Sequence, residues 1–451
     1  MGSPGLRRED RKVSLRNRSF AVPGTKGGGV AGSMSRPTRD RSKRQAATRK
    51  VFRDGTHRLL APEETATRVR RFMPAMGITR IANVTGLDHI GIPVVMVCRP
   101  NSRSLAVSQG KGLDLPLARA SGLMESIETY HAEHITLPLK LASYEELRYT
   151  HPVADVTTLP SITGSVFHPN LRILWIEGHN LLQDEPVWIP YELVHTNYTY
   201  PLPTGSGCFT LTTTGLASGN HVLEAMSHAI CEVVERDATT LWHVMDKGAQ
   251  QRTRVDLNTI SEPTCCETLE KLERAKVGVA VWDITTDVGI PTFLATIMDR
   301  KEDRLRLLYP SVGTGCHPAR HIALLRALTE AAQSRLTFIA GSRDDANRSK
   351  YERSRDPDSQ QKYRAQLETT QPVRSFLDVP TWDTETFNED LAWELDRLRS
   401  AGISQVIVVD LTLPVFRLPV VRVVIPGLEG SNHVPGYAIG ARARALLDGQ
   451  A

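Results

Sequence analysis

Three stretches of the chain carry polar residues at helical spacing, and most of these residues are glutamates. The stripes are Ser121-Glu125-Glu128, Glu224-His228-Glu232-Glu235 and Arg326-Glu330-Gln333. An α-helix turns by about 100° per residue, so offsets of 0, 4 and 7 fall within an arc of roughly 60°. The neighbouring residues are apolar or small, which predicts buried helices, and buried carboxylates need charge partners. Six glutamates directed at one place therefore predict a site for metal ions and a nucleotide.

A lysine between two glycines precedes the first stripe, in the segment Ser108-Gln109-Gly110-Lys111-Gly112. Small residues beside a lysine let backbone N–H groups and an ammonium group approach a phosphate closely. The spacing differs from GxxxxGK[ST], so a P-loop nucleotide site is not indicated. An exposed turn is the commoner meaning of such a segment, but the polar stripe that follows favours phosphate binding.

Small residues also precede the second stripe, and they end at Asn220. Asn220 is expected to cap the helix that starts there, and a helix N-terminus attracts anions. Arg236 follows the last glutamate. In the third stripe Arg326 and Glu330 lie one turn apart and can pair with each other, although arginine facing carboxylates also suits phosphate. Arg335 lies roughly opposite this stripe, so it serves another contact or marks the helix end.

Magnesium explains why a nucleotide site would use so many glutamates. Mg²⁺ prefers oxygen ligands, and several ions bridging the phosphates of ATP would need carboxylates from more than one helix. No Ser/His/Asp or Cys/His arrangement stands out, so no catalytic residue is assigned. Four histidines lack zinc-ligand spacing and are expected to be structural or at the surface: His131, His134, His228 and His243.

Composition favours a reduced, cytoplasmic enzyme. No apolar run in the 451 residues reaches transmembrane length, and no secretory signal is present. The six cysteines form no CxxC pair. Residues 1–50 hold 14 Lys/Arg against three acidic residues, a local charge of +11; because the whole chain carries +5, the remainder sums to −6. This basic tail is expected to be disordered; an unstructured extension, with Met34 as the natural start, is favoured over a nucleic-acid arm.

The apolar pattern indicates an α+β fold, because strands and helices mix without a regular βαβ rhythm. Besides the three stripes, helices are expected near Glu145–Tyr149, Glu267–Ala275 and Glu389–Ala401. The polar stretch Gly341–Gln366 is interpreted as an exposed linker or a solvated helix. Strands are predicted at Pro93–Pro100, Arg172–Trp175, Val187–Leu193, Val277–Ile284, Pro291–Met298, Arg306–Tyr309, Gln405–Asp410 and Val420–Ile425.

At the polar stripes the chain resembles the YcaO family. The matching stretches are SQGKGLDLPLARASGLMESIETYHAE, TGLASGNHVLEAMSHAICEVVERD and GTGCHPARHIALLRALTEAAQSR, within a region from about Gly77 to Pro426. The resemblance implies the YcaO fold, with mixed or antiparallel sheets and long helices lining a site for ATP and Mg²⁺. By position it implies metal ligands at Glu125, Glu128, Glu224, Glu232 and Glu235. It implies ATP contacts, direct or through other residues, at Lys111, Ser121, Asn220, Arg236, Arg326, Glu330, Gln333 and Arg335.

The domain organisation follows from the same resemblance. Residues 1–50 form the basic extension, and residues 51–451 form the YcaO domain. Its ATP- and Mg²⁺-binding core covers about 77–340, a charged linker covers about 341–380, and an α/β part covers 381–451. No leader-binding or partner domain is fused to this chain, so partners are expected to act in trans.

The implied chemistry is phosphorylation of a peptide amide oxygen, followed by attack of a nucleophile and departure of phosphate. A Cys, Ser or Thr side chain gives an azoline, and a sulfide equivalent gives a thioamide. The segment GITRIANVTGLDHIGIPVVMVCRPNSRSLAVSQGKG resembles the subgroup that works beside a TfuA partner and makes thioamides. The chain ends in ARARALLDGQA and lacks the proline-rich PxPxP tail common in azoline-forming members, which also favours a thioamide.

The expected partners are a TfuA-like protein, a sulfur donor and a ribosomally made precursor peptide or protein. A homodimer is expected; a membrane is not, and nucleic acid is disfavoured. Two alternatives stay open: an azoline-forming cyclodehydratase of the same family, and a non-catalytic nucleotide-binding accessory of another modification enzyme.

Overall fold

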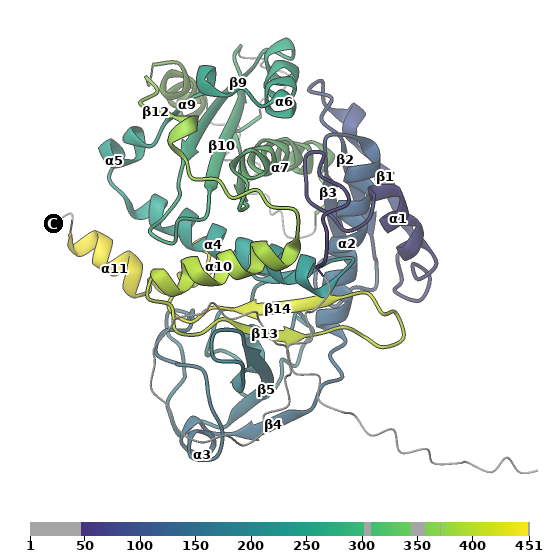
Figure 1. Cartoon of the computed structure of the whole chain (residues 1–451), viewed down its shortest axis with the longest axis vertical. Coiled ribbons are helices and arrows are strands. Elements are labelled where there is room, and N and C mark those ends of the chain that lie inside the picture. Colours follow the sequence, from purple (N-terminus) through teal and green to yellow (C-terminus); the bar gives the residue numbers. More distant parts are fainter. Residues whose placement is uncertain (1–46, 302–307, 344–356, 370, 450–451) are drawn as a thin grey trace, which may run out of the picture.

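A computed structural model describes residues 47–301, 308–343, 357–369 and 371–449 (Figure 1). A mainly antiparallel six-stranded sheet forms one side of the molecule. Its order is β4-β5-β13-β14-β7, and β6 pairs with the other edge of β5. The strands are β4 (Leu139–Ala142), β5 (Ile173–Asn180), β6 (Glu185–Pro190), β7 (Leu216–Ser218), β13 (Ile407–Asp410) and β14 (Val420–Val424).

Two antiparallel three-stranded sheets make up the other side. One contains β1 (Arg80–Asn83), β2 (Val94–Cys98) and β3 (Val107–Lys111); the other contains β9 (Val277–Asp283), β10 (Thr292–Asp299) and β11 (Ser311–Cys316). β3 and β11 are edge strands, and each leads into a long helix that folds back over its sheet. A short parallel pair joins β8 (Val255–Asp256) to β12 (Arg374–Ser375).

Three long helices stand between these sheets: α2 (Leu115–Glu133), α4 (Val222–Val244) and α7 (Arg320–Ala340). α4 packs against β7 and β14 on one side and against α10 (Phe387–Ser400) on another (Figure 1). The remaining α-helices are α1 (Pro62–Arg70), α3 (Tyr144–Arg148), α5 (Lys247–Arg252), α6 (Pro263–Arg274), α9 (Pro357–Thr369) and α11 (Ala441–Asp448). Single 3₁₀ turns are η1 (Thr85–Leu87), η2 (Tyr191–Leu193), η3 (Leu257–Thr259) and η4 (Phe376–Asp378).

The α+β expectation is confirmed, and each predicted helix is present within a few residues of its expected ends. Seven of the eight predicted strands also form. The exception is Arg306–Tyr309, where residues 306–307 lie outside the described residues and the strand that forms is β11, at Ser311–Cys316. The Gly-Lys-Gly segment is another difference, because Lys111 ends strand β3 and is not in an exposed turn. The basic tail, residues 1–46, lies outside the described residues.

The expected linker at Gly341–Gln366 is partly described. Residues 344–356 lie outside the described part. Residues 357–369 form helix α9 (Pro357–Thr369), which is one of the two structures that the polar composition allowed. All six cysteines are free, in agreement with the sequence. Among the helices of the described residues, none combines the length and apolarity needed to cross a bilayer.

Candidate functional site: a carboxylate-rich cavity between three helices

The site is built from three strand–helix units of the same design. In each unit the helix begins four residues after the end of the preceding strand, as the bounds of β3 and α2, β7 and α4, and β11 and α7 show. In each unit a backbone N–H of the strand segment also donates to a glutamate of the helix that follows. These bonds are Gln109 N to Glu125 Oε1 (3.2 Å), Gly215 N to Glu232 Oε2 (3.1 Å) and Thr314 N to Glu330 Oε1 (3.3 Å).

Glycines allow strand and helix to approach this closely. A Cβ atom on Gly110 would lie 2.0 Å from the carbonyl oxygen of Ala118 in α2. In β11, a Cβ on Gly313 would lie 2.2 Å from the nitrogen of Ala331 in α7. Any larger residue would force strand and helix apart. The glycines therefore bring strand N–H groups within reach of the helix carboxylates and fix where those carboxylates point.

The stripes of α2, α4 and α7 face a common cavity of about 550 Å³. Its wall contains all six glutamates of the stripes, which come from three helices far apart in sequence. Eleven of the thirteen candidate residues line it: Lys111, Ser121, Glu125, Glu128, Glu224, Glu232, Glu235, Arg236, Arg326, Glu330 and Gln333. The structure therefore contains the single shared wall that the helical spacing in the sequence predicts.

Negative charge in the cavity is incompletely compensated. Burial raises the pKa of the Glu128 carboxyl to about 8, although Ser218 donates to it from both its N–H (2.8 Å) and its hydroxyl (2.7 Å). Burial likewise raises the pKa of Glu125, Glu224 and Glu232. The charges of Lys111 and Arg343, which also line the cavity, lower the pKa of Glu125 but do not outweigh its burial. These carboxylates are therefore short of cations.

Glu330 differs from the other glutamates because it has a close cation. Lys111 Nζ lies 2.8 Å from Glu330 Oε2. Burial raises the pKa of Glu330, but Lys111 and Arg236 together overcome that effect and hold the pKa at about 2. Arg236 also lies 3.5 Å from Glu232 and 3.8 Å from Glu235, which are long contacts for a guanidinium. Lys111 and Arg236 thus lie on the side of the wall that holds Glu330 and Glu235.

Arg326 does not pair with Glu330, although their one-turn spacing would permit an ion pair. Its Nη2 instead donates to Nε2 of His228, at 2.8 Å. An acceptor at Nε2 requires an imidazole protonated only at Nδ1, and burial together with Arg326 holds the pKa of His228 well below its usual value. His228 is thus part of the cavity wall, not simply a structural or surface residue, and the charge of Arg326 stays available for an anion.

Two of the candidate residues, Arg335 and Asn220, do not line the cavity. Arg335 is buried and donates to Asp88 Oδ2 (2.8 Å) and Asp299 Oδ1 (3.1 Å), so its guanidinium is occupied on the far side of α7. Asn220 donates to Thr65 Oγ1 at 3.0 Å. The N-cap of α4 is the next residue, His221, whose Nδ1 accepts from Leu223 N. Arg335 is thus directed away from the cavity, whereas Asn220 also donates from Nδ2 to Oε1 of the cavity glutamate Glu224 at 3.5 Å.

Several wall residues were not predicted. The segment Gly55–Arg58 lines the cavity, and Arg58 Nη1 lies 3.8 Å from Glu224 Oε1. A lone arginine ahead of the first helix carries no sequence signal. Gln109 accepts from Gln333 Nε2 (3.2 Å) and from Thr337 Oγ1 (2.7 Å). Extending the α7 stripe by one turn, from Gln333 to Thr337, would have identified that part of the wall.

The donor set fits Mg²⁺ and a nucleotide. Carboxylates from three helices supply hard oxygen ligands, and lysine and arginine nitrogens stand beside them. Within the described part of the chain, Gln109 Nε2 and Gln333 Oε1 are buried atoms of the wall without hydrogen-bond partners. A polar ligand would provide the missing partners.

Comparisons with known proteins agree with this geometry. A sequence model of the YcaO family, described as "YcaO cyclodehydratase, ATP- and Mg²⁺-binding", matches residues 109–429. A Rhizobium leguminosarum bv. trifolii protein, described as lying in the tfuA 3′ region, is 36% identical over 87% of this chain and 93% of its own length. A Methanothermobacter thermautotrophicus protein is 35% identical over 86% of this chain and 98% of its own length.

Solved structures show the same fold. YcaO from Methanopyrus kandleri, bound with AMPPCP and Mg²⁺, superposes with a TM-score of 0.67 at 24% identity and covers 85% of this chain and 95% of its own. A heterocyclase in complex with substrate and cofactor superposes with a TM-score of 0.68 at 23% identity over 86% of this chain. The chain spans 54% of the length of that heterocyclase. The matched region includes every glutamate of the cavity, and the chain belongs to the YcaO family of ATP- and Mg²⁺-binding proteins.

Proposed function

We propose that this protein is an ATP- and Mg²⁺-dependent enzyme that activates a peptide backbone amide and installs a thioamide. The observation that carries the catalytic part is the excess of buried carboxylates over cations in one cavity. At neutral pH a carboxyl such as Glu128 is largely kept protonated by burial, and only an added cation would let the whole set ionise. Divalent cations that arrive with polyphosphate meet that requirement.

The residues divide into two groups by chemistry. The five glutamates without a close lysine would hold Mg²⁺: Glu125, Glu128, Glu224, Glu232 and Glu235. Lys111, Arg236 and Arg326 would contact phosphate oxygens, and Ser121, Gln333 and Glu330 would orient the nucleotide or these basic side chains. The strand N–H groups that hold the glutamates keep them in place before the ligand arrives. Positioned charge of this kind is the main way in which proteins accelerate phosphoryl transfer.

When bound, Mg²⁺-ATP would supply the phosphoryl group that turns the substrate amide oxygen into a leaving group. Lys111 and Arg326 both line the cavity, so both would be able to neutralise charge on the transferred group. No dedicated general base is assigned among the wall residues, because burial holds the pKa of the three histidines there, His57, His228 and His317, well below the usual value and makes them poor proton acceptors.

The thioamide is proposed over the azoline on two grounds. The segment from Gly77 to Gly112 resembles members that work beside a TfuA partner, and the 36% identical Rhizobium relative is described by its position in the tfuA 3′ region. A TfuA-like protein and a sulfur donor would then act with this chain on a ribosomally made peptide or protein. A homodimer stays a prediction, which light scattering of the purified protein would measure.

Mass spectrometry of the product tests the reaction. The chain is co-produced with a TfuA-like protein and a precursor peptide encoded beside it. The peptide is expected to gain the mass difference between sulfur and oxygen. A product lighter by one water, without added sulfur, would refute thioamidation and support cyclodehydration.

Matched variants test whether the cavity is catalytic. Glu125→Gln and Glu232→Gln are each expected to abolish the modification and the ATP consumption that accompanies it, whereas Glu177→Gln, at an exposed position of β5, leaves both unchanged. Full modification in both cavity variants would support the accessory alternative instead.

A further inference from the structure

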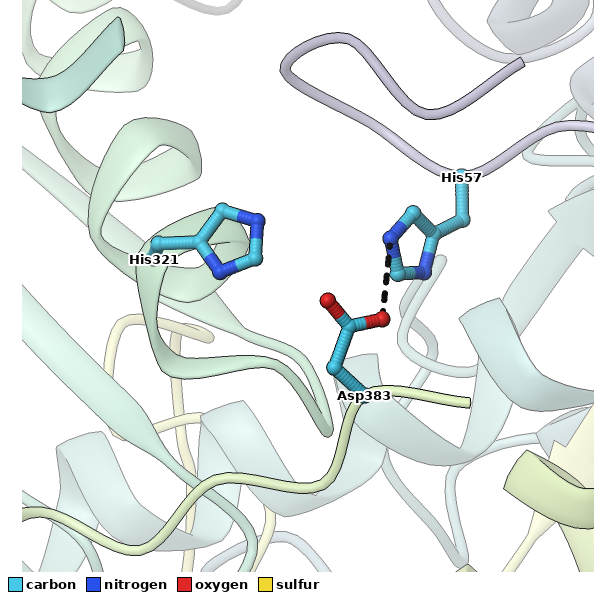
Figure 2. Close-up of side chains that lie close together, drawn as sticks. All are labelled: His57, His321 and Asp383. Atoms are coloured by element: carbon cyan, nitrogen blue, oxygen red, sulfur yellow. Dashed lines mark ion pairs between the residues drawn. The ribbon is translucent and has the colours of Figure 1, made fainter. Parts of the chain in front are cut away.

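Two histidines and an aspartate from three separate segments come together at the N-terminal end of α7. His57 precedes α1, His321 belongs to the first turn of α7, and Asp383 lies between η4 and α10. Figure 2 shows both imidazole rings and the carboxylate facing a common space. One ligand atom from each residue lies within 4.8 Å of the others, and His57 Nε2 is 3.6 Å from Asp383 Oδ1.

This donor set differs from that of the nucleotide cavity. The cavity offers carboxylate oxygens, which suit Mg²⁺, whereas two imidazole nitrogens and one carboxylate oxygen suit Zn²⁺ and related first-row ions. Two ligand atoms bound tetrahedrally to one Zn²⁺ at about 2.1 Å each lie about 3.4 Å apart. The His57–Asp383 distance is close to this value, and the other separations, none above 4.8 Å, would have to shorten to the same range on binding.

Both imidazoles are in the form that binds a metal. Burial and then Lys50 and Arg53 lower the pKa of His57 to about 2, and burial also lowers the pKa of His321. The cluster is therefore not a set of protonated histidines paired with an acid. Nδ1 of His57 is also buried without a hydrogen-bond partner among the described residues. Asp383 has its ion pair with Arg53, so the two histidines are not placed beside it by an ion pair of their own.

Two cations lie near the cluster, and each has a carboxylate partner other than Asp383. Arg53 forms ion pairs with both Asp383 and Glu385, so Glu385 can keep Arg53 when Asp383 turns to a metal. Lys50 is already paired with Asp390, at 2.7 Å. The nearest cations therefore have carboxylates of their own, and a divalent ion at the cluster would face the two neutral rings and Asp383.

The cluster also borders the nucleotide cavity. His57 lies in the segment Gly55–Arg58, which lines the cavity, and its ring packs edge-on against His317 with centroids 4.8 Å apart. Leu59 N donates to Glu224 Oε2 (3.0 Å), so the same segment holds one of the cavity glutamates. Whatever fixes His57 to α7 therefore also fixes part of the cavity wall.

We propose that His57, His321 and Asp383 bind one divalent transition-metal ion of the Zn²⁺ class, with an open fourth position. The ion joins the segment before α1 to α7 and to the loop before α10, and it thereby holds Gly55–Arg58 in place at the cavity wall. The site is separate from the Mg²⁺-binding glutamates and uses none of them.

The test is metal binding by the full-length protein, which needs no substrate. The protein is stripped with a chelator, saturated with Mg²⁺ and titrated with Zn²⁺ by calorimetry; one equivalent of Zn²⁺ is expected to bind under these conditions. Co²⁺ in its place is expected to give the intense visible absorption of a four-coordinate site with nitrogen ligands. Zn²⁺ binding that Mg²⁺ fully displaces, or no binding at all, would overturn the proposal.

Variants assign the ligands. His321→Ala and Asp383→Asn are each expected to weaken Zn²⁺ binding at least about 10-fold, whereas His168→Ala, an exposed histidine, does not change it. Both altered ligands lie at partly exposed positions, so circular dichroism is expected to show a folded protein. Unchanged Zn²⁺ affinity in both folded variants would refute the assignment.

A nucleotide measurement tests the coupling separately. Removal of Zn²⁺ is expected to weaken binding of a non-hydrolysable ATP analogue with Mg²⁺. Equal nucleotide affinity with and without bound Zn²⁺ would refute the role at the cavity wall. Zn²⁺ binding is read without ATP turnover, so its outcome is independent of whether the protein makes a thioamide.

Discussion

Replacing Glu128 with glutamine tests the central physical claim, that the cavity holds carboxylates short of cations. Glutamine has nearly the same shape and keeps an oxygen that accepts the two bonds from Ser218. The change therefore removes the titrating group with little loss of hydrogen bonding. If the site lacks cations to compensate its carboxylates, Glu128→Gln will stabilise the nucleotide-free protein. It will also reduce the increase in stability that Mg²⁺ and nucleotide give on binding.

The size of the effect follows from proton linkage. The pKa of Glu128 is raised by burial to about 8 from an ordinary value of 4.5. Between pH 4.5 and 8 the folded state holds this proton, whereas the unfolded state has released it. The contribution of Glu128 to the free energy of unfolding is therefore greatest below pH 4.5 and falls as the pH rises toward 8. The loss is about 1.4 kcal/mol per pH unit, so moving from about pH 6 to about pH 7.5 costs about 2 kcal/mol through this one group. Above the raised pKa the loss levels off.

The assay is urea unfolding at both pH values without Mg²⁺ or nucleotide, followed by circular dichroism. The wild type is expected to lose about 2 kcal/mol more than Glu128→Gln between the two pH values, because the variant lacks this titration. Glu177→Gln, which alters an exposed glutamate, should retain the wild-type pH dependence. Equal pH dependence of the free energy of unfolding in wild type and Glu128→Gln would refute the claim that burial raises the pKa of this carboxyl.

Three further substitutions separate binding from folding. Lys111→Met should raise the pKa of Glu330, since Lys111 is its closest cation, and should weaken nucleotide binding measured by calorimetry at least about 10-fold with little change in unfolding. Arg335→Met should instead cost about 3–5 kcal/mol of stability in urea unfolding, because it removes the guanidinium that pairs with the buried Asp88 carboxylate, while any folded protein binds nucleotide normally. Gly313→Ala should reduce soluble yield and melting temperature, because β11 would clash with α7.

The sequence was informative about the site because the glutamates recur at the spacing of one helix face and because buried carboxylates need charge partners. Polar residues at offsets of 4 and 7 among apolar neighbours leave few alternatives to a shared polar wall. The strands that hold this wall were harder to predict. β3 and β11 read Val-Ser-Gln-Gly-Lys and Ser-Val-Gly-Thr-Gly-Cys, and their glycines are needed for close packing on helices although they weaken any strand pattern. Packing of each strand on the helix that follows it, more than the residue pattern of the strand itself, decides those segments.

Arg335 shows why residue type alone could not complete the set. α7 is buried on two sides: Arg326, Glu330 and Gln333 face the cavity, whereas Arg335 on the other side binds Asp88 and Asp299. Asp88 lies between β1 and β2 and Asp299 ends β10, so this one arginine ties together the two three-stranded sheets whose edge strands supply two of the three units. A polar residue on either face of such a helix must be paired, and only the identity of its partner distinguishes the two roles. The cavity-facing residues are those whose partners among the described residues are too few, and that deficit, more than the presence of charge, marks the ligand site.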